Sequence, residues 1–400
     1  MAATVVAMTE QHNIVDDAAS QGPDDEAARK AAQEASLALS KAVNEAIAKA
    51  LKGQTPQTAA PNNVVKQYDD AILDSTAVDA TDAEGNPVPV TIPIALAPGI
   101  TVVYTTRLGG VSQGDYAHFN LGGKSGDASE AVEANREALA RELGCKISIV
   151  NQVHGAEPVD VDEQFVENRP FGFDASGTVR DMVDDVEHVN SEVQIIDGDA
   201  QVTTKTDIAL GVFAADCLPV LMADPQAGVI AVAHCGRLGL EKHVISATVK
   251  MMEDKGADRS RIVATLGPAI CGDCYEVGGD IADAFDHVFP GTYTLTRFGG
   301  PGVDLNAAAL QELDAAGIHG DRIISSQPRA NAATQYLSHD EELKQLCRED
   351  NEGNPELDER IGHIHRSLCT LENPIWFSHR RAQLAKKAHE GRMLALIVRH

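Results

Sequence analysis

Basic residues are scarce in this 400-residue sequence, which has 33 lysines and arginines against 60 aspartates and glutamates. The formal net charge is −27, and no basic patch stands out. This balance argues against the phosphate backbone of nucleic acids and against anionic membranes as partners. A small anionic substrate held in a local cationic pocket stays compatible with it.

Long apolar runs are also lacking, so we expect no segment that spans a bilayer. The start, MAATVVAMTEQHNIVDD, lacks the basic and then apolar pattern of a signal peptide. The seven cysteines are odd in number and spread along the chain, which is typical of reduced thiols and not of a disulfide framework. We therefore expect a cytoplasmic protein.

Aromatic residues are nearly absent from residues 1–90, where Tyr68 is the only one. A helix is predicted over 23–53, because Pro23 and the acids after it suit a helix start and Gly53 suits an end. Its narrow apolar stripe consists of Leu39, Val43, Ile47 and Leu51. We expect a solvated helix on a disordered tail, with a docking or dimerisation helix as the alternative.

The composition becomes that of a globular protein near residue 92. We therefore divide the chain into an acidic, alanine-rich N-terminal extension, 1–91, and a globular domain, 92–400. Segments of strand composition and of helical pattern follow one another irregularly in the domain, which predicts an α+β fold and not a regular βαβ alternation. Two stretches, 160–193 and 327–366, look like insertions and are expected on the surface.

One hairpin carries reactive residues at both outer ends. The runs PVLMA and GVIAVA have strand composition, and DPQAG between them holds turn residues. If the hairpin folds about the Pro225–Gln226 bond, Cys217 and His234 face each other with Cβ atoms roughly 5 Å apart. A thiolate and an imidazole at that distance can hold one metal ion, whereas a four-residue loop would shift the register by two.

A third ligand is available in NQVHG, where His154 follows a short apolar run. Taken alone, such a histidine is most often an ordinary loop residue. Together with Cys217 and His234 it would leave tetrahedral zinc one open position, which is the pattern of a catalytic site. Spacing alone leaves open that the three residues are unrelated.

The phosphate-binding motif G-x-x-x-x-G-K-[ST] is absent from the glycine-rich loop TTRLGGVSQGDYAHFNLGG, residues 105–123. The glycines would still let backbone amides approach an anion, with Arg107 as a bidentate partner. An ordinary surface loop is the alternative. The polar residues that we assign to substrate binding here are Ser112, Tyr116, His118 and Asn120.

The stretch GPAICGDCYEVGG contains a C-x-x-C pair, Cys271 and Cys274, but no second C-x-x-C and no matching histidine pair follow. A four-ligand zinc knuckle is therefore not expected, and tight packing is the favoured interpretation of Cys271. The nucleobase-deaminase signature H-x-E…P-C-x-x-C also fails, because Glu157 lies one residue too far from His154 and Pro268 is not adjacent to Cys271.

Six motifs in a fixed order resemble the YfiH family, first named for laccase-domain or multicopper polyphenol oxidases and now described as zinc-dependent purine nucleoside phosphorylases. The motifs are TRLGGVSQGDYAHFNLG, NQVHG, ADCLPVLMADP, AHCGRLGL, GPAICGDCYEVGG and CTLENPIWFSHRR…EGRMLALI. The resemblance covers roughly residues 93–400. It implies mixed β-sheets sandwiched between helices, an αββα arrangement, with zinc on His154, Cys217 and His234.

The resemblance also implies the reactions: phosphorolysis of adenosine, inosine, guanosine and methylthioadenosine, and hydrolytic deamination of adenosine. Zinc with an open position can activate water for attack on C6 of adenine. Arg107 and Arg237 would hold the phosphate. The family usually has Ala, Gly, Trp, Arg, Gly after the second histidine, whereas here Cys235 adds a thiol, the arginine has moved one place to Arg237, and Leu238 occupies its slot.

Three other functions use the same sequence differently. A copper-dependent polyphenol oxidase needs many histidines, but the chain has one H-x-H pair, His363 and His365, inside an apparent insertion. A cysteine hydrolase would use Cys217 as nucleophile with a histidine as base. A non-catalytic scaffold would act through the N-terminal helix. We favour an enzyme with zinc as cofactor and with purine nucleosides and phosphate as its small-molecule partners.

Overall fold

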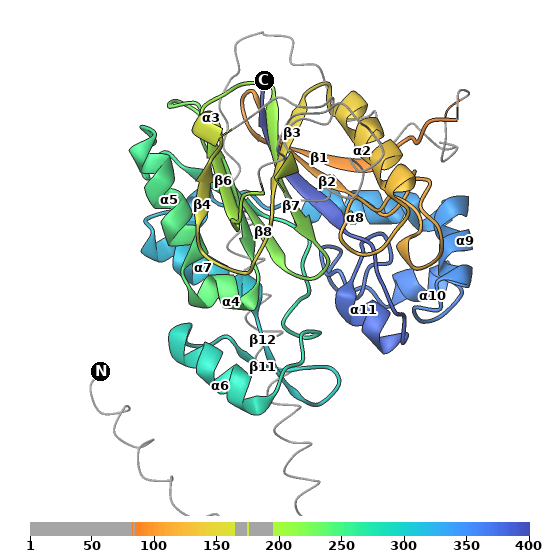
Figure 1. Ribbon diagram of the computed structural model, residues 1–400. Helices are drawn as coiled ribbons and strands as arrows, with labels where there is room; N and C mark the ends of the chain where they lie inside the picture. Colours follow the sequence, from red (N-terminus) through yellow and green to blue (C-terminus); the bar gives the residue numbers. More distant parts are fainter. Residues whose placement is uncertain (1–81, 83–84, 165–173, 176–194) are drawn as a thin grey trace, which may run out of the picture. The chain divides into compact units, whose positions relative to one another are not determined.

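The computed structural model of the chain describes residues 82, 85–164, 174–175 and 195–400 (Figure 1). The predicted helix over 23–53 lies outside the described residues, as does most of the predicted insertion at 160–193. In the described part, no helix combines the length and the apolar composition that crossing a membrane requires.

The first of two large sheets has six strands in the order β1-β2-β13-β7-β3-β5. Their bounds are β1 Thr91–Ala97, β2 Ile100–Thr105, β3 Lys146–Val150, β5 Asp174–Ala175, β7 Ile208–Ala214 and β13 Met393–Arg399. β13 pairs antiparallel with both β2 and β7, while β3 pairs parallel with β7 and β5. The apolar run MLALIVR of β13 is buried almost throughout because both faces of the sheet are covered. Met393, Ala395 and Ile397 belong to one hydrophobic core, and Leu394, Leu396 and Val398 belong to the core on the opposite face.

The second sheet has five strands in the order β10-β8-β9-β6-β4. Their bounds are β4 Pro158–Asp160, β6 Ala200–Thr203, β8 Leu218–Asp224, β9 Val229–Cys235 and β10 Val263–Leu266. β8 and β9 form the predicted hairpin, and every residue of both strands is buried. Burial on both faces explains why their sequences are continuous apolar runs without alternation.

The predicted register of this hairpin about the Pro225–Gln226 bond is wrong. Pro219 is the partner of His234, and Asp224 is the partner of Val229, so the loop has four residues. The Asp224 carboxylate accepts hydrogen bonds from two loop amides, and the Gly228 N–H donates to the Asp224 carbonyl. Gly228 has φ of 67°, a conformation that glycine adopts without steric cost.

The two sheets pack face to face, with helices on both outer faces (Figure 1). The inter-sheet core contains Val102 and Val212 of the first sheet and Leu221 and Val232 of the second. The outer face of the first sheet packs against α2, Ser129–Leu143. The helices on the second sheet are α4 Arg237–Glu241, α5 Val244–Asp254 and α7 Leu305–Ala315, and α6 Gly279–Val288 packs against α4. The predicted α+β fold with sandwiched sheets is thus confirmed.

The segment 327–366 was expected on the surface, but its helices extend the inter-sheet core. They are α8 Gln327–Tyr336, η5 Leu337–His339, α9 Glu341–Glu349 and α10 Leu357–Gly362. Their buried apolar residues are Ala330, Ala333, Leu337, Leu343, Leu346 and Leu357. The expectation failed because acidic surface positions dominate the sequence of this segment, while its apolar residues recur at helical spacing and point inward.

The remaining short elements connect these layers. They are η2 Gly114–Tyr116, α3 Val161–Gln164, η4 Gly320–Arg322, α11 His379–Leu384, and the small hairpin of β11 Tyr293–Leu295 and β12 Pro301–Val303. Of these, α11 follows Phe377 of the inter-sheet core, with Ser378 between them. Its N-cap Ser378 accepts a hydrogen bond from the Arg381 amide, which ends the preceding loop in a defined place.

Candidate metal centre

Three side chains from three elements converge at one end of the two sheets. Cys217 directly precedes β8, His234 lies near the end of β9, and His154 follows β3. Their potential ligand atoms all lie within 4.8 Å of one another. The Cys217 Sγ is 3.8 Å from the His154 Nε2, and the two imidazole centroids are 4.8 Å apart. Because His234 pairs with Pro219, Cys217 reaches it diagonally across the hairpin and not directly.

A buried carboxylate orients two of these residues. The His234 Nδ1 donates to the Asp199 Oδ1 over 2.8 Å, so the Nε2 is the ring nitrogen that can bind a metal in place of a proton. The same carboxylate accepts the backbone amides of Val153, His154 and Gly155. Burial raises the pKa of Asp199, but the hydrogen bonds from His234 and Gly155 outweigh it and hold the pKa below its ordinary value. Asp199 therefore stays ionised at neutral pH.

The thiol is favoured as a thiolate. Burial raises the pKa of Cys217, but the charge of His234 and the hydrogen bonds from His154 and His234 lower it to about 6. Burial likewise lowers the pKa of His234, while Cys217 and Asp199 raise it to about 9. A thiolate is the form that binds metal ions and the form that attacks as a nucleophile. Two imidazoles and one thiolate fit zinc and leave a fourth position open.

Backbone conformations at the site are unusual for residues other than glycine. His154 has φ of 56° and Asp216, next to Cys217, has φ of 101°. Asp216 is held there because its carboxylate accepts from the Thr370 Oγ1 at 2.7 Å and from the Arg380 amide at 2.6 Å. Such conformations persist only where surrounding contacts enforce them, and they cluster at functional sites.

A cavity of about 680 Å³ opens over the three ligands. Its cationic side chains are Lys124, Arg237, Arg380 and Arg392. Despite the acidic composition of the chain, the cavity is thus locally cationic, as a small anionic substrate requires. A larger hollow of about 1020 Å³ lies between the end of α2 and the start of β7 and contains none of the three ligands.

The cationic side chains of the cavity differ in whether a carboxylate pairs with them. Arg237 pairs with Glu241 at 2.6 Å, and Arg392 pairs with Glu390 at 2.6 Å. Within the described residues, Arg380 has no carboxylate partner. Its Nη1 donates to the Glu276 carbonyl at 2.8 Å, and its guanidinium lies 5.6 Å from the centre of the Tyr275 ring.

Residues 101–348 match the profile of the family described as multi-copper polyphenol oxidoreductase laccase. The chain belongs to this laccase/YfiH family. A purine nucleoside phosphorylase of Streptomyces griseus is 42% identical over 218 residues, which are 54% of this chain and 79% of the relative. A purine nucleoside phosphorylase of Deinococcus radiodurans is 36% identical over 262 residues, which are 64% of this chain and 90% of the relative. The adenosine deaminase RL5, from an unknown prokaryotic organism, is 32% identical over 236 residues, which are 57% and 83% of the two chains.

Solved structures of the laccase/YfiH family share the fold. A DUF152 protein of Neisseria meningitidis is 28% identical, with a TM-score of 0.54 over 78% of this chain and 98% of its own. YlmD of Geobacillus stearothermophilus is 24% identical, with a TM-score of 0.56 over 81% and 100% of the two chains. The predicted resemblance to the YfiH family is therefore confirmed.

The fold brings four of the predicted site residues together and leaves five elsewhere. His154, Cys217, His234 and Arg237 line one cavity. The residues that do not line it are Arg107, Ser112, Tyr116, His118 and Asn120.

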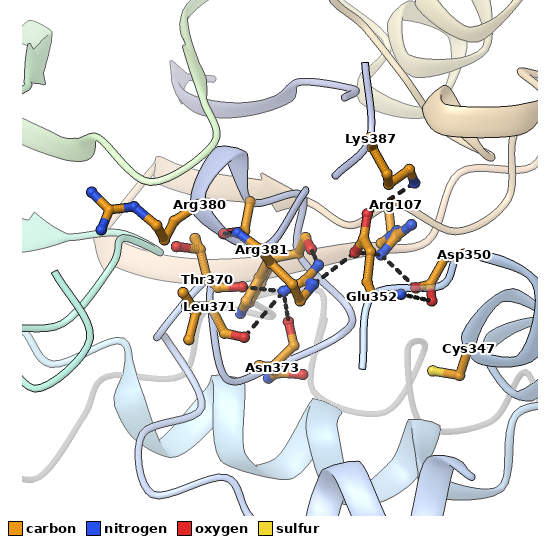
Figure 2. A network of polar contacts seen from close by, with 12 residues as sticks. Arg107, Cys347, Asp350, Glu352, Thr370, Leu371, Asn373, Arg380, Arg381 and Lys387 are labelled. Carbon is orange, nitrogen blue, oxygen red and sulfur yellow. Dashed lines mark hydrogen bonds and ion pairs between the residues drawn. The ribbon is translucent and has the colours of Figure 1, made fainter. Parts of the chain in front are cut away.

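Arg107, predicted to hold phosphate, instead lies buried against Asp350 and Glu352 (Figure 2). Its Nη1 is 3.3 Å from Asp350 and 3.0 Å from Glu352, and its guanidinium lies over the Phe377 ring. These carboxylates follow α9, in the segment predicted as an insertion. They pair with the Nη1 of the guanidinium, and the whole side chain is buried. Arg107 is thus a buried, ion-paired residue outside the cavity, where it is not placed to contact a phosphate.

The four polar residues of the glycine-rich loop hold the loop itself. The Asn135 amide donates to the Ser112 Oγ, Tyr116 donates to the Ser125 carbonyl, and His118 pairs with Glu342. Asn120 is buried, and its Oδ1 accepts the amides of Gly122 and Arg392. The part of this region that lines the cavity is the end of the loop and the two residues after it, namely Gly122, Gly123, Lys124 and Ser125.

Sequence reasoning missed Asp199, Lys124, Arg380 and Arg392. Asp199 lies outside the six motifs of the sequence, and only the pairing of β6 with β9 brings it beside His234. Arg380 and Arg392 lie within the last resembling motif, which carried no assigned role. The added thiol, Cys235, points into the core of the second sheet, where burial raises its pKa well above the ordinary value. It is therefore not a ligand of this centre.

Proposed function

We propose that the chain is a zinc-dependent purine nucleoside phosphorylase that also deaminates adenosine. The observation that carries the proposal is the His154, Cys217 and His234 set beneath a cavity with four cationic side chains. The names of the family relatives supply the substrate class, since they include purine nucleoside phosphorylases and an adenosine deaminase. The range we expect is adenosine, inosine, guanosine and methylthioadenosine.

When bound at these three ligands, zinc supplies a Lewis acid with one open position. The residues of the chain set the geometry around it. Asp199 fixes the tautomer of His234 and, through the amides of residues 153–155, the position of His154. The cavity size matches that of pockets for ligands as large as a nucleoside.

Phosphorolysis joins a phosphate oxygen to C1′ of the ribose while the bond from C1′ to the purine nitrogen breaks. The phosphate must be held against the sugar, and its charge must be offset. Arg380 and Lys124 are suited to this, because neither has a carboxylate partner among the described residues of the cavity. Arg237 and Arg392 add positive charge that Glu241 and Glu390 partly offset.

The departing purine must take up a proton, and His379 is the cavity group suited to donate it. Its Nδ1 pairs with the Glu390 Oε1 at 2.9 Å. This hydrogen bond raises the pKa of His379 above its ordinary value despite the opposing effect of burial. The imidazolium of His379 therefore persists to higher pH than that of an ordinary histidine. Its Nε2, which makes no hydrogen bond within the described residues, is placed to donate.

The test is to incubate the zinc-loaded protein with adenosine, with and without phosphate and with and without a strong chelator. Adenine and ribose 1-phosphate should form only when phosphate is present, and inosine should form in either case, because water supplies the oxygen. Chelation and His154→Ala should each suppress both reactions. His363→Ala, which changes a histidine outside the cavity, is the matched control and should leave both unchanged.

The result that would overturn the proposal is a zinc-loaded protein that converts no purine nucleoside. A cysteine hydrolase would instead survive the chelator. A polyphenol oxidase, which the family description keeps as the alternative, would consume oxygen with phenols after copper loading. In the described residues, however, His363 and His365 belong to no group of three or more metal-binding side chains.

A further inference from the structure

A second group of metal-binding side chains lies outside the candidate metal centre. It consists of Cys271, Cys274, Cys369 and Glu372, whose ligand atoms all lie within 4.8 Å of one another. Only the first two residues stand out in the sequence as a C-x-x-C pair, from which no four-ligand site is expected. The other two come almost a hundred residues later and are spaced C-x-x-E, so no search for a second C-x-x-C could find them.

Each half of the group is a single tight turn that places residues i and i+3 on the same side. In the first turn, the amides of Cys274 and Tyr275 both donate to the Cys271 carbonyl at 2.9 Å. In the second, the Cys369 amide donates to the Arg366 carbonyl, and the Asn373 amide donates to the Cys369 carbonyl. The backbone of the chain thus presents two pairs of ligands, one from each turn.

Backbone hydrogen bonds hold the two turns side by side. The Ala269 amide donates to the Leu368 carbonyl at 3.0 Å, and the Thr370 amide donates to the Ala269 carbonyl at 3.1 Å. The four side chains are therefore brought together by ordered backbone and not by flexible side chains alone. Such preorganisation is what a protein needs to hold a metal ion in fixed geometry.

The group is closed off from solvent, which ordinary packing does not explain. All three cysteines are at most 2% exposed, and the Glu372 side chain is 1% exposed. Thiols are weak hydrogen-bond donors, and the Sγ atoms of Cys271 and Cys274 lie 3.9 and 3.6 Å from the Glu372 Oε1. A carboxylate buried against three thiols is costly unless charged partners compensate for the lost hydration.

Compensating groups surround the carboxylate. The Glu372 Oε2 accepts the amides of His365 and Arg366 at 2.7 and 2.8 Å, and Arg297 pairs with the Oε1. These contacts fix the carboxylate with one oxygen toward the sulfurs. Three thiolates, one carboxylate and a divalent ion leave a net negative charge. The adjacent Arg297 and Arg366 offset part of it, and Arg366 also pairs with Asp273 at 3.7 Å.

We propose that Cys271, Cys274, Cys369 and Glu372 form a structural zinc site in which all four positions are taken by the protein. Thiolates select zinc over magnesium or calcium, and four protein ligands are typical of structural and not of catalytic zinc. The candidate metal centre differs because it has three ligands and opens into the cavity. The four-ligand site does not depend on the proposed function.

The site has a consequence for the cavity next to it. The first turn is flanked by Ile270 and Tyr275, which both line the cavity. The second turn contains Thr370, which together with the Ile270 amide binds Asp216 beside Cys217. A zinc ion that joins the two turns would therefore brace one wall of the cavity without contacting a substrate.

The test counts metal ions in purified protein and identifies their ligands. Elemental analysis should find two zinc ions per chain in the wild type. One should remain in the triple variant His154→Ala, Cys217→Ala, His234→Ala, and X-ray absorption at the zinc edge should show three sulfur ligands and one oxygen ligand for that ion. Cys369→Ser should lose one zinc ion relative to the wild type, whereas Cys145→Ser, which changes a thiol outside both groups, should lose none.

A milder variant and a second measurement distinguish loss of the zinc site from misfolding of the variant chain. Glu372→Gln keeps the three thiols and should weaken zinc binding at this site without removing the ion of the candidate metal centre. Mass spectrometry of the untreated chain should find no disulfide among the three cysteines. The proposal is overturned if the wild type holds at most one zinc ion while the triple variant holds none, or if Cys271 is found oxidised to a disulfide with Cys274 or Cys369.

Discussion

At the scale of single residues, Asp199 controls the candidate metal centre without being a ligand. One buried carboxylate binds the ring of His234 and the backbone of the loop that carries His154. Groups in this position fix the orientation of metal-binding histidines and raise their basicity. The effect of changing Asp199 should therefore appear in metal affinity.

Asp199→Asn keeps the size of the side chain but places an NH₂ donor opposite groups that themselves donate. We expect zinc affinity to fall about 10- to 100-fold. Competition with a chromophoric chelator measures this change. The matched control is Asp197→Asn, which alters a neighbouring exposed contact with Asn151 and should leave the affinity unchanged. Equal affinities for Asp199→Asn and wild type would show that the carboxylate does not support the metal.

The proposed role of His379 predicts a specific pH dependence of phosphorolysis. Its pKa is raised above the ordinary value of 6.5, so the imidazolium persists to higher pH than that of a free histidine. If the protonated form supplies the proton to the purine, kcat/KM for phosphorolysis should fall as pH rises through the raised pKa. His379→Gln should abolish this limb of the profile.

Glu390→Gln should move the same limb to lower pH, because it removes the hydrogen bond that raises the pKa of His379. Deamination, which releases no purine base, serves as the internal control and should keep its profile. A phosphorolysis profile that is identical in His379→Gln and wild type would remove His379 from the mechanism.

At the scale of elements, two helices carry arginines that line the cavity, and these two arginines have different hydrogen-bond partners. Arg237 of α4 is paired with Glu241 one turn later, whereas Arg380 of α11 donates to a backbone carbonyl. The free charge on α11 should therefore contribute more to phosphate binding than the compensated charge on α4.

Arg380→Ala should raise the KM for phosphate about 10-fold or more, since a hydrogen bond to a charged group contributes about 1.5–3 kcal/mol. Arg237→Ala should raise it less, and both variants should change the KM for adenosine less than the KM for phosphate. Initial rates at varied phosphate and fixed adenosine, and the reverse, separate the two effects. A larger phosphate effect for Arg237→Ala would show that Glu241 does not offset its charge in the bound state.

Elements were easier to predict from the sequence than the contacts between them. The composition of β8 and β9 identified the hairpin, but its register depended on how Asp224 holds a four-residue loop, which apolar patterning does not encode. The three metal ligands were proposed from motifs. The role of Arg107 was missed because its partners, Asp350 and Glu352, lie more than 240 residues later.

At the scale of the whole molecule, a buried ionic cluster ties the segment after α9 to the rest of the domain (Figure 2). Glu352 pairs with Arg107, Arg381 and Lys387 at 3.0, 2.7 and 2.9 Å. Burial raises the pKa of Glu352, but these three cations outweigh it and hold the pKa well below the ordinary value of 4.5. The ionised form is thus strongly favoured in the folded state.

Glu352→Gln leaves three buried cations without their shared carboxylate and should lower the free energy of unfolding by about 3–5 kcal/mol at pH 7. Urea denaturation followed by circular dichroism measures this difference. Because the folded pKa is depressed, the stabilisation is present above the unfolded pKa near 4.5 and is lost as pH falls through the folded pKa. The difference in the free energy of unfolding between wild type and variant should therefore become smaller below pH 4.5. A difference that does not change with pH would exclude Glu352 ionisation as its origin.

The position of β13 within the first sheet constrains how the protein is made. β2 and β7 both pair with Met393–Arg399, so on a ribosome each of them emerges long before the strand that joins them. Until that strand arrives, two apolar strands have open edges to which other nascent chains can add. The six-stranded sheet thus closes late, by contacts between residues almost 300 positions apart, which slows folding. The chain should depend on chaperones during synthesis far more than its folded stability would suggest.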